Sequence, residues 1–483
     1  MNSSPQTVPW LTRLERKLFA SRFVTFSLLV HVMILILGGS IIIAQKPLPD
    51  DLPPTAKIEM PDTEVVREIT CVGPPTTEVT LAIMPPKTLS LDSIVRHVDM
   101  DSHFALAVTT GAAKRTEGVS DFPDTPTGPS EVGSAFRTPL MINRIGEDRM
   151  NVLKRRGGSE ATEAAVLGGL RWLKKTQNQD GSWGDEYKAS MTGLALLAFL
   201  GHGEDQTSPE FGPAVGGAVE WLRVAGRDFE GRLSLTKDGW GSGMGAVYEH
   251  AIATYALADY YGLTGDARVE PLLRQAIGHI VAGQAPDGGW NYGYAKKPNS
   301  DTSVSGWQIQ ALISAHHSRL VIKGVDEALD KAMVNLKRVQ SEDGNFHYQK
   351  LGDRGDNSSL AGVGALCSAV WHTGGSERLG NKGAKFLLES NRRGLDYRSE
   401  TADLYAWYYH AQACSAVGGT PWTKWNRLFR DVIVNAQSPE GNWPPTQGRS
   451  PGGELQRKPD GAGPVYRTAL CVLMLETYYR NVF

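Results

Sequence analysis

The sequence predicts an all-α fold, an α6/α6 toroid in which six helical hairpins form two concentric rings, preceded by a single transmembrane helix and a Pro-rich linker. Three observations predict it. An aromatic residue recurs at similar intervals through the last two thirds of the chain, a charged amphipathic helix precedes each of these residues, and an almost uncharged apolar helix follows. A helix that is apolar on most sides is buried on most sides. The second helices of the hairpins are therefore expected to share an interior. An open superhelix is the alternative, but six pairs can close a ring and neither end of the array has a polar capping repeat.

Residues 23–44 form a 22-residue apolar run with one ionisable side chain, His31. A helix of about 20 apolar residues crosses the roughly 30 Å hydrocarbon core of a bilayer. The run is longer than the apolar part of a signal peptide, and Ile42, Ile43 and Ala44 match the A-x-A cleavage pattern poorly. We therefore expect an uncleaved single-pass anchor that contacts the lipid bilayer through residues 23–44.

Charges on the two sides of this run predict its orientation. Asp50 and Asp51 follow the run, whereas residues 1–22 carry basic side chains shortly before it: Arg13, Arg16, Lys17 and Arg22. Basic residues favour the cytoplasmic side of a membrane. We expect a basic cytoplasmic N-terminus at residues 1–22 and, in a bacterial cell membrane, an extracytoplasmic (periplasmic) location for the rest of the chain.

Residues 45–158 are predicted to be a Pro-rich, largely unstructured linker. Between residues 46 and 140 the chain has 13 of its 27 prolines and no tryptophan. Such a segment buries too little apolar surface to offset the conformational entropy lost on ordering. The folded domain is therefore expected to span residues 159–483, beginning at Ser159.

The repeat within residues 159–483 closes on an aromatic residue at six positions: Trp183, Trp240, Trp290, Phe346, Tyr397 and Trp443. Gln stands six residues earlier in four of the units: Gln177, Gln284, Gln340 and Gln437. An Asp-Gly or Glu-Gly pair between them supplies the left-handed residue that ends a helix. We expect Gln to hydrogen-bond backbone groups left unpaired at the helix end, and the ring to pack over the start of the next inner helix. The repeat thus predicts a structural staple between hairpins.

The stretches WLKKTQNQDGSW and NLKRVQSEDGNF resemble the QW repeat of squalene-hopene cyclases. Over about residues 160–480 the chain is similar to the superfamily of terpenoid cyclases and protein prenyltransferase β subunits, in a membrane-anchored bacterial form. The resemblance implies an α6/α6 toroid. It also implies that chemistry, where there is any, lies at the N-terminal ends of the inner helices, which line the mouth of a cavity.

The signatures of the active members are incomplete in this chain. The segment 298–303 resembles the Asp-x-Asp-Asp-Thr-Ala motif of class II cyclases, but Ser300 stands where the proton donor belongs. It also resembles the Asp-x-Cys zinc ligands of prenyltransferases, with Ser303 in place of Cys, and the later His position falls on Ser359 or Ala406. We therefore expect neither a metal site nor a cofactor in this chain.

Three residues on inner helices are candidate catalytic groups. Asp301 begins an inner helix, where a carboxylate also serves as an N-cap. Glu249 and His250 lie on the second inner helix, although a histidine on an apolar helix is equally compatible with a core position. Aromatic and polar residues on the inner helices suit an apolar pocket, a sugar platform or plain packing. The candidate ligand-binding residues are Tyr248, Trp307, Asp403, Tyr405, Tyr408 and His410.

Composition excludes several function classes. The net charge is -2 and charged residues make up 21% of the chain, so there is no broad basic surface of the kind that nucleic acid needs. The four cysteines form no C-x-x-C pair, which argues against a zinc ribbon or a dithiol site.

Three functions remain, and whether the chain is an enzyme stays open. The first is binding of a hydrophobic, isoprenoid-like ligand or of a partner protein without turnover, which the altered motifs favour. The second is a squalene-cyclase-like lyase or isomerase that uses Asp301 or Glu249 as its acid. The third is an envelope glycan hydrolase or lyase, which would need a pair of carboxylates across a cleft.

Overall fold

The structure, a computed structural model, describes residues 143–144, 148–234, 245–353, 358–371, 375–450 and 453–480. All of them belong to the compact unit that spans Asp101–Phe483. The predicted basic terminus, the membrane span 23–44 and most of the linker lie outside these residues. None of the helices in the described part has the length and apolar character that a bilayer crossing requires.

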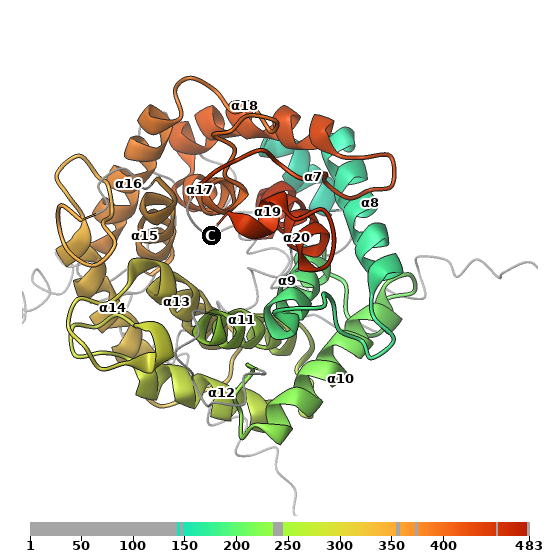
Figure 1. The fold of residues 1–483 in the computed structure, drawn as a ribbon, viewed down its shortest axis with the longest axis horizontal. Coiled ribbons are helices and arrows are strands. Elements are labelled where there is room, and N and C mark those ends of the chain that lie inside the picture. Colours follow the sequence, from blue (N-terminus) through green and yellow to red (C-terminus); the bar gives the residue numbers. More distant parts are fainter. Residues whose placement is uncertain are drawn as a thin grey trace, which may run out of the picture. The chain divides into compact units, whose positions relative to one another are not determined.

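Two rings of helices surround one axis (Figure 1). The outer ring consists of α8 (Glu160–Thr176), α10 (Gly212–Asp228), α12 (Glu270–Gly283), α14 (Val325–Val339), α16 (Ser376–Ser390) and α18 (Gly419–Ala436). The inner ring consists of α9 (Lys188–Gly201), α11 (Ala246–Thr264), α13 (Thr302–His317), α15 (Ser358–Val370), α17 (Leu404–Val417) and α20 (Ala462–Leu475). Four short helices complete the described chain: α7 (Asp148–Arg155), η1 (Tyr292–Tyr294), α19 (Glu454–Arg457) and η2 (Glu476–Tyr478).

The inner ring is closed. Each inner helix contacts the next one along the chain, and the last, α20, contacts the first, α9. The outer helices contact one another in the same order from α10 to α18, and α18 also contacts α8. The all-helical toroid predicted from the alternation of amphipathic and apolar segments is therefore confirmed.

The two kinds of helix follow from their side chains. In α14 the apolar residues recur on one face, so Val325, Leu329 and Leu336 are buried while the charged face meets solvent. In α9 nearly every residue is small or apolar and nearly every residue is buried. Small residues also let the inner helices approach closely: a Cβ on Gly193 would stand 3.1 Å from the backbone of Ala253 in α11.

The Gln residues of the repeat bond in two directions. Gln177 Nε2 donates to Gly181 O (2.8 Å) in its own turn and to Ala214 O (2.9 Å) in the next outer helix, α10. Gln284, Gln340 and Gln437 make the same pair of bonds, each to its own turn and to the next outer helix. The predicted link between hairpins is present, but each Gln bonds its own turn and the next outer helix and not the groups at the end of its own helix.

The closing tryptophans complete this arrangement from inside. Trp183, Trp290 and Trp443 are fully buried, and the indole Nε1 of each donates to a carbonyl ten residues earlier at 2.8 Å. The fifth unit differs, because Asn391 Nδ2 donates to Leu387 O within its own helix. The aromatic residue of the second unit, Trp240, lies outside the described residues.

The last part of the predicted linker is ordered. Arg144 is 3% exposed, and its guanidinium bonds Asp259 Oδ2 at 2.8 Å, Leu200 O at 3.3 Å and Arg480 O at 3.1 Å. These partners stand at the C-terminal ends of α11 and α9 and just after η2. The chain therefore docks on the toroid before the predicted domain start at Ser159, which is the N-cap of α8.

Candidate functional site

Asp301 stands at the N-terminus of α13 and caps it. Its carboxylate accepts hydrogen bonds from the backbone amides of Ser303 (2.9 Å) and Val304 (3.2 Å), two of the amides that a helix start leaves unpaired. The residue has no exposed surface. Burial raises the pKa of the Asp301 carboxyl, against the lowering effect of these amides and of the nearby hydroxyls.

Hydroxyl groups gather around this carboxyl. Ser303 Oγ donates to Asp301 Oδ1 and lies 2.8 Å from the hydroxyl of Tyr248, which in turn lies 3.2 Å from that of Tyr292. The neighbouring Asp301 carboxylate, together with burial, raises the pKa of Tyr348. We call Asp301, Ser303, Tyr248, Tyr292 and Tyr348 the Asp301 cluster. Its three tyrosines are only half-buried, so a molecule outside the fold can reach them.

Below the cluster, aromatic side chains cross the interior. Trp307 stacks on Tyr408 with ring centres 5.7 Å apart and planes 19° apart, and Tyr409 meets it edge-on at 5.6 Å. Gln310 Nε2 also donates to the Tyr409 hydroxyl at 3.0 Å. Trp307 belongs to α13 and Tyr408 to α17, which are separated in the ring by α15. The contact therefore joins two inner helices that are not neighbours in the ring.

Tyr405 joins the cluster to this aromatic layer. Its ring centre lies 5.0 Å from that of Tyr409 and 6.5 Å from that of Trp307. The ring is partly exposed and its hydroxyl is buried. Burial raises the pKa of this hydroxyl, against the lowering effect of hydrogen bonding with Tyr409 and Trp307.

Glu249 caps a helix other than its own. Its Oε2 accepts from the amide of Ala189 (3.1 Å) at the start of α9, where the N-cap residue Tyr187 offers no side-chain bond. Burial raises the pKa of the Glu249 carboxyl to about 7. The predicted acid is thus present and poised near neutrality, but its observed contact is structural.

His250 is held away from the mouth. The ring is fully buried, with Nδ1 3.0 Å from the amide of Leu233 and Nε2 3.0 Å from Ala276 O of α12. An amide can only donate, so Nδ1 accepts and Nε2 carries the proton. Burial lowers the pKa of His250 to about 3, which keeps the ring neutral. These bonds tie the loop before α11 to the outer helix α12, so the role of His250 is structural.

The two polar candidates of α17, Asp403 and His410, lie in different surroundings. Asp403 caps α17 by accepting from the amide of Ala406 at 2.9 Å, and burial raises the pKa of its carboxyl. His410 is fully buried and meets Trp425 of the outer helix α18 edge-on, at 5.1 Å between ring centres. His410 therefore faces the outer ring, whereas Asp403 remains at the N-terminal end.

Sequence reasoning missed Ser303 as a partner of Asp301, and it missed Tyr292 and Tyr348 in loops. Both tyrosines follow the closing aromatic of a repeat by two residues, after Trp290 and Phe346. That recurrence was the available signal. No group of three or more His, Cys, Asp or Glu residues in the described part could hold a metal ion.

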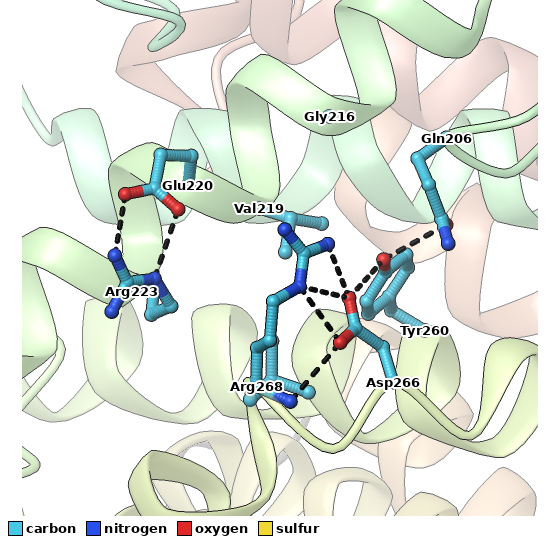
Figure 2. Close-up of a pocket in the computed structure, with 9 residues that line it drawn as sticks. Gln206, Gly216, Val219, Glu220, Arg223, Tyr260, Asp266 and Arg268 are labelled. Carbon is cyan, nitrogen blue, oxygen red and sulfur yellow. Dashed lines mark hydrogen bonds and ion pairs between the residues drawn. The ribbon is translucent and has the colours of Figure 1, made fainter. Parts of the chain in front are cut away.

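A hollow of about 220 Å³ lies elsewhere, between α10 and the loop after α11 (Figure 2). Its charged residues are satisfied in pairs: Arg268 bonds Asp266 at 2.6 Å and Arg223 bonds Glu220 at 2.6 Å. Tyr260 also donates to Asp266 at 2.8 Å. With its polar groups already paired, this hollow offers little to a ligand, and the Asp301 cluster remains the candidate site.

Comparison with known proteins finds no matching protein-family model and no matching curated protein. The type II terpene cyclase MstE from Scytonema, with bound geranylgeranyl dihydroxybenzoate, is a similar solved structure: TM-score 0.46, 14% identity, 66% of this chain and 97% of that chain. An α-1,6-mannanase of Salegentibacter sp. with α-1,6-mannotriose has a TM-score of 0.49 and 11% identity, over 66% of this chain and 99% of that chain. A glycoside hydrolase family 76 mannosidase from Bacteroides thetaiotaomicron has a TM-score of 0.45 and 10% identity, over 66% of this chain and 98% of that chain.

The fold of this chain is decided by its own closed double ring of helices. This chain is an α/α toroid. At such low identity the likeness concerns the fold alone, and one fold of this kind hosts unrelated activities. The function of the chain has to be argued from its own site.

Proposed function

We propose that the chain is a ligand-binding α6/α6 toroid that residues 23–44 hold on the membrane, with the toroid outside the cytoplasm. Its ligand site is the Asp301 cluster together with Tyr405, at the N-terminal ends of the inner helices. A ligand with apolar surface and hydrogen-bonding groups fits this site, because tyrosine rings and hydroxyls line it together.

One observation carries the proposal: partly exposed tyrosines from four separate segments of the chain gather near the Asp301 carboxyl. Tyr248 comes from α11, Tyr292 from η1, Tyr348 from the loop between α14 and α15, and Tyr405 from α17. A ligand at this end of the ring can bond the tyrosine hydroxyls while it covers the exposed parts of the rings.

Turnover has weaker support. A cyclase of the squalene type needs a deep apolar chamber, but Trp307, Tyr408 and Tyr409 occupy the interior below the cluster. A glycan hydrolase needs two carboxyls about 5–9.5 Å apart across its substrate. Asp301, Asp403 and Glu249 instead bond amides at three different helix starts. These features favour binding without chemistry.

Proton donation by Asp301 is the second candidate function, favoured by the raised pKa of its buried carboxyl. Asn is as good an N-cap as Asp, so Asp301→Asn keeps the helix start and removes the acid. If the chain is an enzyme of this kind, D301N binds the same molecule as the native chain but releases no altered product. Mass spectrometry of the bound and released molecules distinguishes the two functions.

The test of the proposal is native mass spectrometry of the full chain, purified in detergent, followed by extraction and identification of bound molecules. We expect a bound small molecule whose occupancy falls about fivefold in Tyr405→Phe, the change that one lost hydrogen bond of about 1 kcal/mol produces. Tyr261→Phe is the matched control, since its hydroxyl bonds Glu270 on the outer side at 3.2 Å. Equal occupancy in Y405F and Y261F, or an empty native chain, would refute it.

A further inference from the structure

Tyr187 occupies an unusual backbone position. It is the N-cap of α9 and has φ 51° and ψ 38°, in the left-handed region. An L-residue other than Gly, Asn or Asp is disfavoured there because its Cβ crowds the backbone. Its side chain is 45% exposed, so the fold gains little by burying the ring. A residue that strains the backbone and contributes little to the core points to a role outside the fold.

The strained segment is held from several sides. Glu249 of α11 bonds the amide of Ala189 two residues later, and Glu186 forms an ion pair with Lys458 near the start of α20. The Tyr187 ring lies against the bare backbone of Gly245, where a Cβ would stand 3.2 Å from its Cε1 atom. Gly245 is the N-cap of α11, three residues before Tyr248. The exposed ring thus stands at the same end of the inner helices as the Asp301 cluster.

The chemistry of this end selects among ligand classes. The partners of Asp301 and Tyr248 are Ser303, Tyr292 and backbone amides, all uncharged, and the nearby cation Lys458 is already paired with Glu186. A phosphate or diphosphate group would find carboxyls and no unpaired cation among these contacts. A pure hydrocarbon would cover the tyrosine hydroxyls without bonding them, at the cost of burying polar groups.

A neutral, hydroxyl-rich ligand satisfies both conditions. Its hydroxyls can donate and accept among Tyr248, Tyr292 and Tyr405, and the C–H face of a sugar ring is an apolar surface that packs on an aromatic ring. We propose that the mouth binds a neutral oligosaccharide and that Tyr187 is the platform on which one of its sugar rings stacks. This inference rests on the proposed binding function.

Tyr187→Gly separates binding from folding. Gly adopts the left-handed region freely, so this variant should unfold at a higher urea concentration than the native chain. It should also bind the sugar about tenfold more weakly, the loss expected from an aromatic stacking contact of about 1.4 kcal/mol. Tyr187→Phe keeps the ring and should bind within about twofold of the native chain.

Glu230→Gly is the matched control. Glu230 also has a positive φ, 54°, and it is exposed just after α10, where its carbonyl accepts from His279 Nε2 of the outer helix α12 at 2.9 Å. The variant should gain the same stability and bind as the native chain does. Calorimetry on the full chain in detergent measures the binding of each variant. The neutral probes are cellotriose, mannotriose and xylotriose, and the isoprenoid probes are farnesol and farnesyl diphosphate.

The outcomes are distinct. Binding of at least one neutral trisaccharide that weakens in Y187G and not in E230G supports the inference. Trisaccharide binding that is equal in Y187G and the native chain overturns the role of Tyr187. Farnesol binding that Tyr405→Phe weakens, with no trisaccharide bound, overturns the ligand class and leaves the proposed binding function standing. If neither kind of probe binds and the native chain carries no molecule of its own, both fail.

Discussion

At the residue scale, the buried carboxyls of this toroid show how one group serves both structure and chemistry. Asp301, Asp403 and Glu249 all accept bonds from amides at the starts of inner helices, where the helix dipole favours a negative charge. Burial nevertheless raises the pKa of all three, because removing a carboxylate from water costs more than these bonds return. Each carboxyl is therefore a cap that is also easier to protonate than a surface acid.

Glu249 gives this a measurable pH dependence. Its pKa is 4.5 in the ordinary state and about 7 when folded, so between these values the folded chain holds a proton that the unfolded chain has lost. The free energy of unfolding therefore has its full contribution from Glu249 below pH 4.5. As the pH rises to 7, that contribution is lost, by up to about 3 kcal/mol. Glu249→Gln keeps an oxygen for the Ala189 amide and has no proton to lose. In urea unfolding, E249Q should exceed the native chain in stability at pH 8 and approach it at pH 5.

The control for this prediction is Glu230→Gln, a change at an exposed carboxyl. E230Q should follow the native chain at both pH values, which removes the effect of the other titrating groups. A stability difference between E249Q and the native chain that stays constant from pH 5 to pH 8 would contradict the assignment.

The candidate site was predictable where local sequence determines it. Asp301 begins a helix and caps it as its position indicates, and Tyr248 and Tyr405 lie near the starts of apolar helices that had to be inner ones. The roles of His250 and His410 were not predictable, because their partners Ala276 and Trp425 come from outer helices. Helical periodicity tells how much of a helix is buried, but not which neighbour each buried side chain meets.

At the element scale, the repeat explains why hairpins of such different sequence assemble alike. In the four units that contain Gln, the glycine of the turn has a positive φ and lies against the next outer helix: a Cβ on Gly288 would stand 2.1 Å from Lys331 O, and one on Gly441 would stand 2.4 Å from Gly168 O. Glycine is thus required twice, for conformation and for space. The sequence predicted the turn, but the contact with the neighbouring hairpin depends on the closed ring.

Gln437 makes the seam where the last hairpin meets the first. Its Nε2 donates to Gly441 O and to Ala165 O of α8, each at 2.8 Å. Gln437→Ala removes both bonds and leaves carbonyls without partners, which should cost about 1–3 kcal/mol of unfolding free energy. Urea unfolding of the full chain measures the loss.

Asn391→Ala is the comparison within the same fold. Asn391 holds the corresponding place in the fifth unit, but it bonds only Leu387 O, in its own helix, at 2.8 Å. Its loss should cost less than about 1 kcal/mol, since no second helix is tied. Equal losses in Q437A and N391A would show that the bond between outer helices contributes nothing.

At the scale of the whole molecule, the two ends of the inner ring differ in chemistry. The N-terminal end has partly exposed tyrosine hydroxyls and capping carboxyls, whereas the C-terminal end has buried charges of both signs, among them Arg144, Arg480, Asp259 and Glu476. Arg480, 1% exposed, donates to the Tyr255 hydroxyl at 3.0 Å and lies 5.5 Å over its ring. Cations near helix C-termini complement the negative end of the dipole. The buried charges at the C-terminal end thus serve to close the fold.

Closure at that end depends on Arg144, and this can be tested. Arg144 and Asp259 are 3% and 6% exposed and bond at 2.8 Å. Removing one partner of a buried ion pair leaves the other charge uncompensated and typically costs about 3–5 kcal/mol. We expect that loss in Arg144→Ala, measured by urea unfolding of the full chain, although Arg144 lies outside every predicted helix.

The double variant R144A/D259N identifies the cause. It replaces the stranded carboxylate with a neutral amide, so it should recover part of the stability lost in R144A. Arg171→Ala, which breaks an exposed pair with Glu210 at 2.7 Å, should change stability by less than about 1 kcal/mol. Losses of the same size in R144A and R171A would mean that the ring closes without the segment before α7. A large loss in R144A with no recovery in the double variant would place the effect in the bonds to Leu200 O and Arg480 O instead.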